Sequence, residues 1–349
     1  MSFSNFLMYI FGAGSIELRM AVVLILGVIF VNGWTDAPNA ITASVSTGAV
    51  SLRGGILLAA VFNFVGALTM GILNSSVLRS IGEMTMLLDS GGEEAVMILS
   101  AALLSIIIWS TIAWIFGIPT SESHALISGI VGAALAYKGG LIGNGIIAIR
   151  IAIIGLAISL PVGFLLGAGI GKMLDIIAFN CNYLTAKRVK GLQRIGAAAM
   201  AFMHGAQDSQ KFAGVFLGAI CMSGGYSGNV DRVPLWLTII CSIVISIGTA
   251  AGGYRIIKRV GMGTVELTPI KGLAADIAGS TCMLGASVLG MPVSTTHTAT
   301  ASVIGAGISS SPRKINVSSV KEMMIAWILT FPCCGLISFL AVKLYLYFV

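Results

Sequence analysis

Long stretches without any charged side chain limit most strongly what this chain can fold into. Residues 55–78 and residues 95–117 contain no Asp, Glu, Lys or Arg, and each stretch is long enough to cross a bilayer as a helix, which takes about 20 residues. Charged residues make up 9% of the chain, whereas a soluble domain carries about 25%. Because backbone polar groups in a bilayer must be paired within the protein, we expect an all-α, multi-pass protein of the cytoplasmic membrane, surrounded by lipid.

Composition also narrows the choice of partners and cofactors. The 20 Lys and Arg residues exceed the 13 Asp and Glu residues, an excess that is typical of the cytoplasmic loops of membrane proteins, so we predict no nucleic-acid partner. The six cysteines show no CxxC spacing, so we interpret them as packing residues and expect no metal centre and no cofactor.

The chain contains two copies of one motif-bearing repeat. GWTDAPNA at residues 33–40 corresponds to GAQDSQKFAG at residues 205–214, and GIPTSESHA at residues 117–125 corresponds to GMPVSTTHT at residues 290–298. The separation is 88 residues from Asp36 to His124 and 89 residues from Asp208 to His297. This spacing predicts a first repeat at residues 1–180 and a second at residues 195–349, joined by a basic linker at residues 181–194.

Loop charges predict that the two repeats have opposite orientations in the membrane. Residues 79–94 carry one basic and four acidic side chains, whereas the corresponding residues 255–271 carry four basic and one acidic. The linker carries Lys187, Arg188, Lys190 and Arg194. Since Lys and Arg favour the cytoplasmic side, equivalent loops should face opposite sides and the linker should be cytoplasmic. Inverted-topology repeats are typical of secondary transporters, which bind their cargo near the midplane, where the repeats meet.

Each copy has a helix-breaking site followed by hydroxyl side chains. Gly117 and Pro119 interrupt the first apolar run, and Gly290 and Pro292 interrupt the second. We therefore expect discontinuous transmembrane helices that form re-entrant hairpins, with new helices through residues 125–137 and 299–308 that begin at Ser or Thr N-caps. The hydroxyl side chains after the two prolines are Thr120, Ser121, Ser123, Ser294, Thr295 and Thr296.

Two such helix N-termini would form a binding site for a tetrahedral anion. A helix N-terminus presents unpaired N–H groups and a partial positive charge, and a nearby hydroxyl can rotate to donate to an oxyanion. The same pattern also fits a proline-kinked helix whose serines bond to the freed carbonyl groups. Its occurrence at matching positions in both copies favours the anion site.

Ionisable side chains inside apolar segments are costly and usually mark a path for an ion or a substrate. Such residues here are Asp36, Glu122, Asp208, Lys211 and Asp276, and the three histidines of the chain, His124, His204 and His297, all lie in the repeated motifs. Asp36 and Asp208 would repel an anion. We therefore expect a coupling cation, Na⁺ or H⁺, at each aspartate, with Lys211 offsetting part of the remaining charge.

The motifs resemble those of the inorganic phosphate transporter (PiT, or Pho-4-like) family. That family carries a G-x-N-D-x-A-N-A-like signature in its first half, an H-G-x-N-D-x-Q-K-like signature in its second, and P-x-S-x-[ST]-H in both; here these read GWTDAPNA, HGAQDSQK, PTSESH and PVSTTH. The match extends over nearly the whole chain. The resemblance implies phosphate symport by an elevator-like homodimer, with a site formed by Asp36, Asn39, Asp208 and the two hydroxyl clusters.

Three departures from the family pattern bear on the coupling ion. Thr35 and Gln207 replace the asparagine that often precedes each aspartate, Pro38 replaces a small residue, and Glu122 stands between the hydroxyls of the first cluster. If the asparagines help to bind Na⁺, their loss favours H⁺, which the Glu122 carboxyl could carry; otherwise Glu122 is an ordinary buried acid. The candidate coupling-ion residues are Asp36, Asp208, Glu122, Thr35, His124 and His297.

We therefore predict a cation-coupled symporter of inorganic phosphate and not an enzyme. A membrane-embedded hydrolase would need a nucleophile–base pair or a metal site, and the sequence has no HExxH motif and no ordered Ser/His/Asp set. A channel would not need paired coupling carboxylates. Sulfate is the nearest alternative cargo, but carboxylate acceptors favour phosphate, which retains a proton to donate. The candidate substrate-binding residues are Asp36, Asn39, Thr120, Ser121, Ser123, Gln207, Asp208, Lys211, Ser294, Thr295 and Thr296.

Overall fold

The computed structural model describes residues 2–85, 88, 92–141, 145–180, 186–225, 233–252, 257, 265–309 and 315–348. Within these ranges the chain is helical, apart from turns and one isolated antiparallel bridge between Val265 and Ile315. The helical elements in chain order are α1 (Phe3–Met8), η1 (Tyr9–Ala13), α2 (Ile16–Thr35), η2 (Ala37–Ile41), α3 (Thr42–Ser46), α4 (Leu52–Leu73), α5 (Ser76–Thr85), α6 (Glu93–Ile115), α7 (Glu122–Lys138), α8 (Gly145–Asn180), α9 (Ala186–Met222), α10 (Leu235–Ala251), α12 (Pro269–Val288), α13 (Thr295–Ile308) and α14 (Val317–Phe348).

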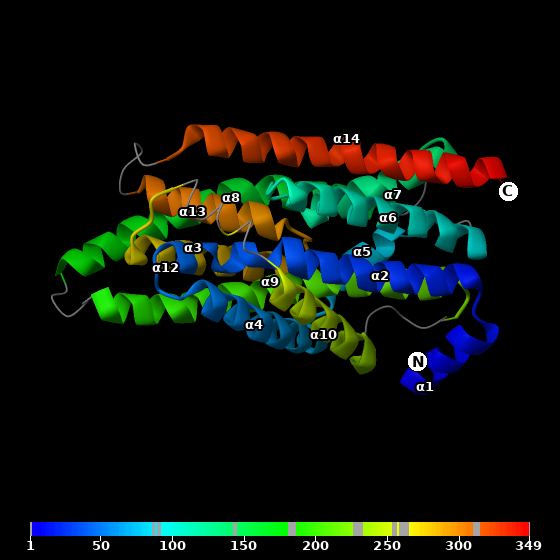
Figure 1. Ribbon diagram of the computed structural model, residues 1–349, viewed down its shortest axis with the longest axis horizontal. Helices are drawn as coiled ribbons and strands as arrows, with labels where there is room; N and C mark the ends of the chain where they lie inside the picture. Colours follow the sequence, from blue (N-terminus) through cyan, green and yellow to red (C-terminus); the bar gives the residue numbers. More distant parts are fainter. Residues whose placement is uncertain are drawn as a thin grey trace.

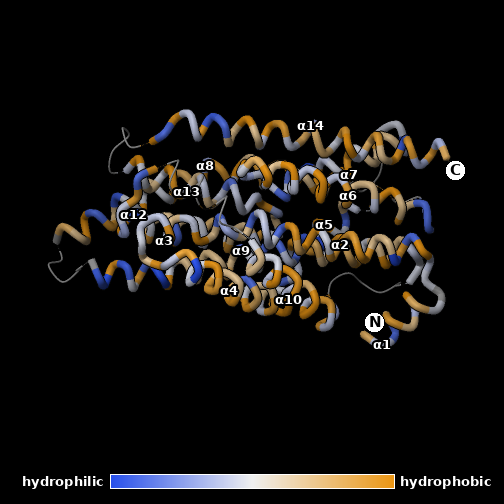
Figure 2. The backbone as a smooth tube through the Cα atoms, viewed as in Figure 1, coloured by the Kyte–Doolittle hydropathy of each residue, from blue (hydrophilic) through white to orange (hydrophobic). Residues whose placement is uncertain are grey.

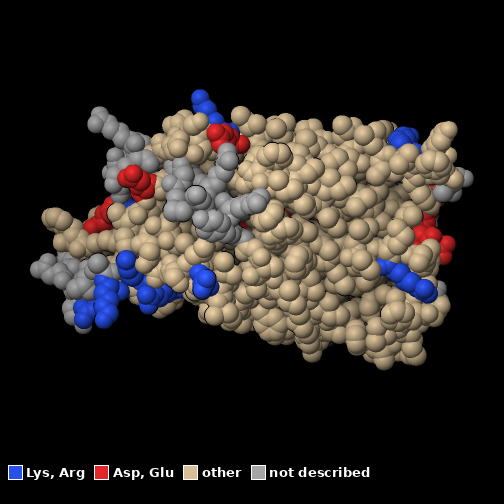
Figure 3. Space-filling view, viewed as in Figure 1, with Lys and Arg blue, Asp and Glu red and all other residues tan. Residues whose placement is uncertain are grey.

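Most of the helices run side by side along the long axis of the molecule (Figure 1). In the described part of the chain, five segments are long and apolar enough to cross a membrane: Ile16–Ser46, Leu52–Leu73, Glu93–Ile115, Ile146–Phe179 and Val317–Phe348. Hydrophobic residues colour the middle of the helices (Figure 2), and charged side chains on the visible face gather at the two ends of the long axis (Figure 3). This distribution is that of a protein whose sides face lipid and whose ends face water.

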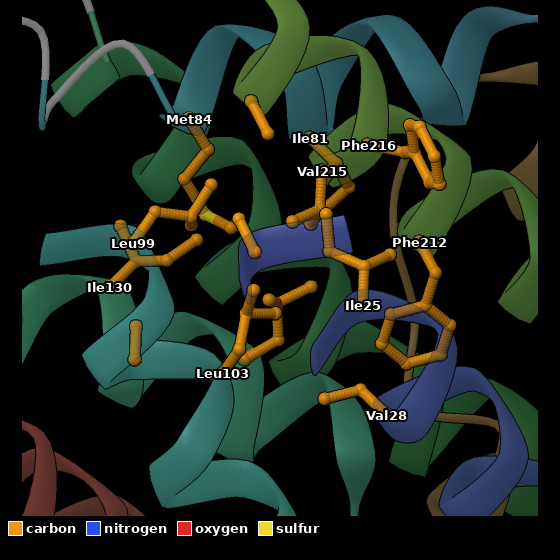
Figure 4. Packing of buried hydrophobic residues seen from close by; sticks show 14 of the residues in the cluster. Ile25, Val28, Ile81, Met84, Leu99, Leu103, Ile130, Phe212, Val215 and Phe216 are labelled. Atoms are coloured by element: carbon orange, nitrogen blue, oxygen red, sulfur yellow. The ribbon is translucent and has the colours of Figure 1, made fainter. Parts of the chain in front are cut away.

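The largest hydrophobic core lies where α2, α5, α6, α7 and α9 meet (Figure 4). Its labelled side chains are Ile25, Val28, Ile81, Met84, Leu99, Leu103, Ile130, Phe212, Val215 and Phe216. This core packs the α6–α7 pair against α2 and α9, which carry Asp36 and Asp208, so it fixes the distance between the motifs of the two copies.

Glycine allows the helices to approach closely. A Cβ atom added at Gly66 of α4 would lie 1.9 Å from the carbonyl oxygen of Phe202 in α9, and one added at Gly132 of α7 would lie 2.2 Å from that of Gly335 in α14. Both distances are far below van der Waals contact, so only glycine fits these crossings. The glycine-rich composition therefore serves helix packing at these positions.

The apolar runs end at matching positions in the two copies. α6 ends at Ile115 and α12 at Val288, and each is followed by a glycine with φ near +66°, Gly117 and Gly290. The N–H of the residue after each glycine bonds to a carbonyl five residues back, from Ile118 to Ala113 and from Met291 to Ala286. This is the Schellman arrangement, in which a glycine in the left-handed conformation closes a helix. It turns the chain back within the bundle.

The structure begins the next helices earlier than the sequence predicted. α7 begins at Glu122 and α13 at Thr295, and not near residues 125 and 299, because Ser121 and Ser294 serve as N-caps. Residues 186–194 of the predicted linker form the first turns of α9. Residues 181–185 lie outside the described residues, as do Asp89, Arg255, Lys258 and Arg259 from the loop-charge comparison.

Candidate functional site

The starts of α7 and α13 meet inside the molecule. The Oγ of Ser121 accepts a hydrogen bond from the backbone N–H of His124 (3.3 Å), and the Oγ of Ser294 accepts one from that of His297 (3.1 Å). The two capping hydroxyls also bond to each other, with Ser121 Oγ 2.8 Å from Ser294 Oγ. α6 and α7 lie in one half of the molecule and α12 and α13 in the other (Figure 1). The positive ends of two helices from opposite halves are therefore in direct contact.

A single hydroxyl connects the two repeated aspartates. Asp36 caps the C-terminal end of α2 and Asp208 lies within α9, and both side chains are almost fully buried. Thr295 Oγ1 lies 3.0 Å from Asp36 Oδ2 and 3.3 Å from Asp208 Oδ2. Asp36 Oδ1 also accepts hydrogen bonds from Asn39 Nδ2 at 2.8 Å and from the Thr296 hydroxyl. The first turn of α13 thus binds the carboxylate of the other copy.

Asp208 has a charged partner of its own. Lys211 Nζ lies 2.6 Å from Asp208 Oδ1. The other carboxylate oxygen, Oδ2, accepts a hydrogen bond from Asn32 Nδ2 at 3.0 Å and lies 3.4 Å from His204 Nε2. All of these side chains are buried. Their mutual pairing reduces the large cost of burying a charge.

The Glu122 carboxyl lies in the first turn of α7 and contacts the first aspartate motif. Its Oε1 accepts a hydrogen bond from Thr35 Oγ1 at 3.0 Å, and its Oε2 has no hydrogen-bond partner among the described residues. Glu122 is buried, with 2% of its surface exposed. Thr35 is the residue directly before Asp36, so an acid of the first hairpin is held beside the first carboxylate.

The motif histidines His124 and His297, together with Gln207 and Asp276, make contacts with α14, α12 and α9. The His124 and His297 rings pack edge to face with centroids 4.4 Å apart, and they contact Phe331 and Trp327 of α14. Gln207 donates its amide to Ser287 Oγ of α12 at 2.8 Å. Asp276 packs against Gly196 of α9. A coupling role for the histidines and substrate contact by Gln207 stay predictions.

The other predicted ligands line the junction of the two helix starts. Thr296 Oγ1, which shares its one proton between Asp36 Oδ1 and the Thr120 carbonyl oxygen, lies 2.9 Å from that carbonyl oxygen. Ser123 Oγ donates to the Val293 carbonyl at 3.0 Å while accepting from Lys211 Nζ at 2.8 Å. Of the five ionisable residues found in apolar segments, Asp36, Glu122, Asp208 and Lys211 are thus brought to one region.

Sequence reasoning missed Asn32 and Asn63, which contact Asp208 directly or through His204. Asn63 of α4 donates to Thr249 Oγ1 of α10 at 3.0 Å, and its carbonyl oxygen lies 3.2 Å from His204 Nδ1. His204 thus lies between Asn63 and Asp208, and Asn32 approaches Asp208 from α2. The sequence feature that could have identified them is an asparagine inside an otherwise apolar run, at Asn32 and Asn63. An amide side chain buried in an apolar segment needs a hydrogen-bond partner there.

The arrangement can hold a cation. One ligand atom each from Asp36, His204 and Asp208 lies within 4.8 Å of the others, and all three residues are buried. Two carboxylates this close repel each other in a medium of low dielectric constant. A proton or a small cation between them would relieve that repulsion.

Comparison with known proteins identifies the family. Residues 32–191 and residues 180–338 each match the model of the phosphate transporter family. The chain belongs to this family. A "Probable low-affinity inorganic phosphate transporter" from Bacillus subtilis is 35% identical over 316 residues, which cover 90% of this chain and 92% of that protein. A protein of the same name from Rhizobium meliloti is 32% identical over 332 residues, which cover 92% of this chain and 96% of that one.

The fold is also that of a known structure. A solved structure entitled "The sodium-dependent phosphate transporter" superposes with a TM-score of 0.77 over 96% of this chain and all of that chain, at 20% sequence identity. Membership of the family confirms the resemblance seen in the motifs. Together with the apolar helices it establishes a multi-pass transporter of the cell membrane. The alternative of a membrane-embedded hydrolase is therefore wrong.

Proposed function

We propose that this chain carries inorganic phosphate across the cytoplasmic membrane together with a coupling cation. The observation that carries the proposal is the meeting of two capped helix starts from opposite halves of the molecule beside two buried aspartates that share the Thr295 hydroxyl. Family membership and the names of the relatives support phosphate as the cargo. The residues at the junction support a site that handles an anion and a cation together.

We infer that the two halves are inverted repeats with discontinuous helices. The support is threefold: the family model matches twice, each half has the same Schellman turn and serine cap, and the two hairpins, α6–α7 and α12–α13, lie at opposite ends of the bundle. In such a fold the cargo binds near the midplane, where broken helices expose backbone groups to it.

The anion would bind between the helix starts of α7 and α13. Backbone N–H groups in the first turn and the hydroxyls of Ser121, Ser123, Ser294 and Thr296 are donors suited to phosphate. Ser121 Oγ and Ser294 Oγ are 2.8 Å apart, so a phosphate oxygen can enter between them only if the two tips separate. Binding is therefore coupled to a movement of one hairpin relative to the other.

The cation would bind at the carboxylates. A phosphate beside Asp36 and Asp208 adds negative charge to a buried region, and a proton or Na⁺ bound there offsets it. Glu122 is placed to carry a proton next to Asp36, through its hydrogen bond to Thr35. We propose that the transporter works as a homodimer in contact with membrane lipid, as the family resemblance implies.

Uptake into proteoliposomes tests this function. The purified protein should accumulate radiolabelled phosphate when a pH gradient or a sodium gradient is imposed separately, and whichever gradient drives uptake identifies the coupling ion. Labelled sulfate tests the alternative cargo under the same gradients. Accumulation of sulfate without accumulation of phosphate would contradict the proposal.

The aspartates provide the matched variants. Asp36→Asn and Asp208→Asn should each abolish uptake while leaving expression intact, because each removes a buried carboxylate that holds a positive charge at the site. Glu83→Gln serves as the control, since Glu83 is a partly exposed acid that forms an ion pair with Arg79, four residues earlier. Normal uptake by both aspartate variants would remove these residues from the coupling mechanism.

A further inference from the structure

Lys211 is surrounded by the kind of oxygen atoms that bind a small monovalent cation. Its Nζ lies 2.6 Å from Asp208 Oδ1, 2.8 Å from Ser123 Oγ and 2.7 Å from the Val293 carbonyl oxygen. These three acceptors satisfy all three N–H donors of the ammonium group. They are a carboxylate of α9, a hydroxyl of α7 and a backbone carbonyl from the non-helical stretch between α12 and α13. Unwound carbonyls of this kind coordinate Na⁺ in other transporters with broken helices.

The surroundings of Lys211 are buried and belong to both hairpins. Lys211 has 1% of its surface exposed, Asp208 also 1%, and Ser123 4%. Ser123 and Val293 come from opposite halves of the molecule, and Ser123 Oγ donates to the Val293 carbonyl at 3.0 Å. The ammonium therefore lies at the junction of the hairpins, where a bound cation would hold the two tips together.

The two copies carry different residues at the position of Lys211. Lys211 follows Asp208 by three residues, and Asn39 follows Asp36 by three residues. Asn39 Nδ2 donates to Asp36 Oδ1 at 2.8 Å, as Lys211 Nζ does to Asp208 Oδ1 at 2.6 Å. The donor occupies the same place in each copy, but it is neutral in the first and charged in the second. Asp208 thus forms an ion pair with a residue of its own motif, and Asp36 does not.

We propose that the Lys211 ammonium takes the place of a coupling cation at Asp208. The second copy then contains a cation site that is filled by its own side chain, and Asp36, with Glu122 beside it, is left to exchange a cation with solution. The inference rests on the proposed function, because it divides the coupling role between the two carboxylates. It predicts that the chain moves fewer cations per phosphate than a version in which the ammonium has been removed.

Three variants of Lys211 test the proposal. Lys211→Ala removes the ammonium and leaves space among the three oxygens. Lys211→Asn places in the second copy the residue that the first copy has at the equivalent position. It replaces the alanine variant in the test if the alanine variant does not fold. Lys211→Met is the matched control, because it removes the charge but fills the space with a chain of similar length.

The first measurement is the melting temperature in lipid nanodiscs without phosphate, in sodium chloride and in choline chloride. Sodium should raise the melting temperature of Lys211→Ala or Lys211→Asn by about 5 °C more than that of the wild type, when sodium is near 100 times its dissociation constant. Lys211→Met should show the same sodium response as the wild type. This assay does not depend on phosphate, so it tests Lys211 even if the cargo proves to be a different anion.

The second measurement is phosphate uptake into proteoliposomes. Lys211→Ala or Lys211→Asn should be inactive in choline and should regain uptake in sodium, with a steeper dependence on sodium concentration than the wild type shows. The proposal is overturned if the folded alanine and asparagine variants respond to sodium no more than the wild type does in both assays. It is also overturned if Lys211→Met acquires the same extra response, since sodium would then bind elsewhere. A wild type that melts normally but accumulates no phosphate would instead disprove the proposed function.

Discussion

The Thr295 hydroxyl places a strict limit on the charge of the site. A threonine hydroxyl has one proton to donate, yet Thr295 Oγ1 lies within hydrogen-bonding distance of a carboxylate oxygen of both Asp36 and Asp208. It can donate to only one of them at a time. When the two hairpins are closed as they are here, the other contact needs a proton on a carboxylate or a cation between them. Under the proposed coupling, we therefore expect cation binding to favour the closed state.

Glu122 gives a residue-scale test of proton coupling. Its Oε1 accepts from Thr35 Oγ1 at 3.0 Å and its other oxygen has no hydrogen-bond partner among the described residues, so a proton can be added there without breaking a bond. A proton bound from the acidic side and released on the other side would move with phosphate. Uptake by the wild type should rise as the outside medium is acidified, and Glu122→Gln should flatten this dependence.

The control for Glu122→Gln is Glu94→Gln, which makes the same change in the first hairpin at the outer end of α6. Glu94 accepts a hydrogen bond from Tyr137 at 2.9 Å and is exposed. This variant should keep the wild-type pH profile. Proton coupling through Glu122 is contradicted if Glu122→Gln keeps the wild-type pH profile and uptake depends strictly on sodium. Glu122 would then be a structural acid.

At the scale of the helices, the cap role of Ser121 and Ser294 can be separated from their proposed role in binding phosphate. Ser121 and Ser294 cap α7 and α13, so replacement by alanine costs each helix about 1 kcal/mol of stability. If the hydroxyls also donate to phosphate, Ser121→Ala and Ser294→Ala should weaken phosphate binding by about 5- to 150-fold, because a hydrogen bond to a charged group contributes about 1–3 kcal/mol. Calorimetric titration with phosphate measures this change.

Ser51→Ala separates the two roles of the serines. Ser51 caps α4 in the same way, with its Oγ accepting from the Gly54 N–H at 3.2 Å, but it lies at an exposed helix end. This variant should lose a similar amount of stability and keep the wild-type phosphate affinity. Unchanged affinity in all three serine variants would mean that Ser121 and Ser294 act only as caps.

The packing of α8 against α13 offers a second test at this scale. A Cβ atom at Gly167 would lie 2.4 Å from the Ser302 carbonyl oxygen of α13, whereas a Cβ at Gly169, in the same helix, meets nothing within 4 Å. Gly167→Ala should therefore separate the helices and cost about 1–3 kcal/mol, while Gly169→Ala should leave stability unchanged or slightly raised. Thermal unfolding in detergent compares the two, and an equal loss in both would contradict close packing at Gly167.

The whole molecule has a basic end and an opposite end that holds both termini. α9 begins with Lys187, Arg188 and Lys190 at the end where Lys and Arg gather in Figure 3, and the N- and C-termini lie at the other end in Figure 1. Since basic residues favour the cytoplasm, both termini should face the outside. The two hairpins would then enter from opposite sides of the membrane.

Reporter fusions check this orientation. Alkaline phosphatase attached at the C-terminus should be active, because the enzyme folds only outside the cytoplasm, and green fluorescent protein at the same place should stay dark. The reverse pattern should appear when the reporters are inserted before α9. Fluorescence from a C-terminal fusion would show instead that the protein has the opposite orientation, with the basic end of α9 outside the cell.

The sequence by itself determined the features that depend on neighbouring residues. Uncharged runs such as residues 55–78 made the chain a membrane protein, and the repeated motifs identified its family. Gly117 and Gly290 predicted where the apolar helices end, although the helices that follow begin a few residues earlier than predicted. These features are local, because a helix cap or a Schellman turn is completed by residues within about one turn of the chain.

Only the tertiary structure decided which of these residues share a site. Thr295 reaches Asp36 across 259 positions of sequence, Ser121 reaches Ser294 across 173, and Thr35 reaches Glu122 across 87. The histidines had the same sequence pattern as the other motif residues, yet His124 and His297 pack against α14. The direction in which a side chain at the start of α7 or α13 points depends on how the two hairpins pack against α2 and α9. That packing is fixed by glycine contacts and core side chains far apart in the sequence, so no local pattern contains it.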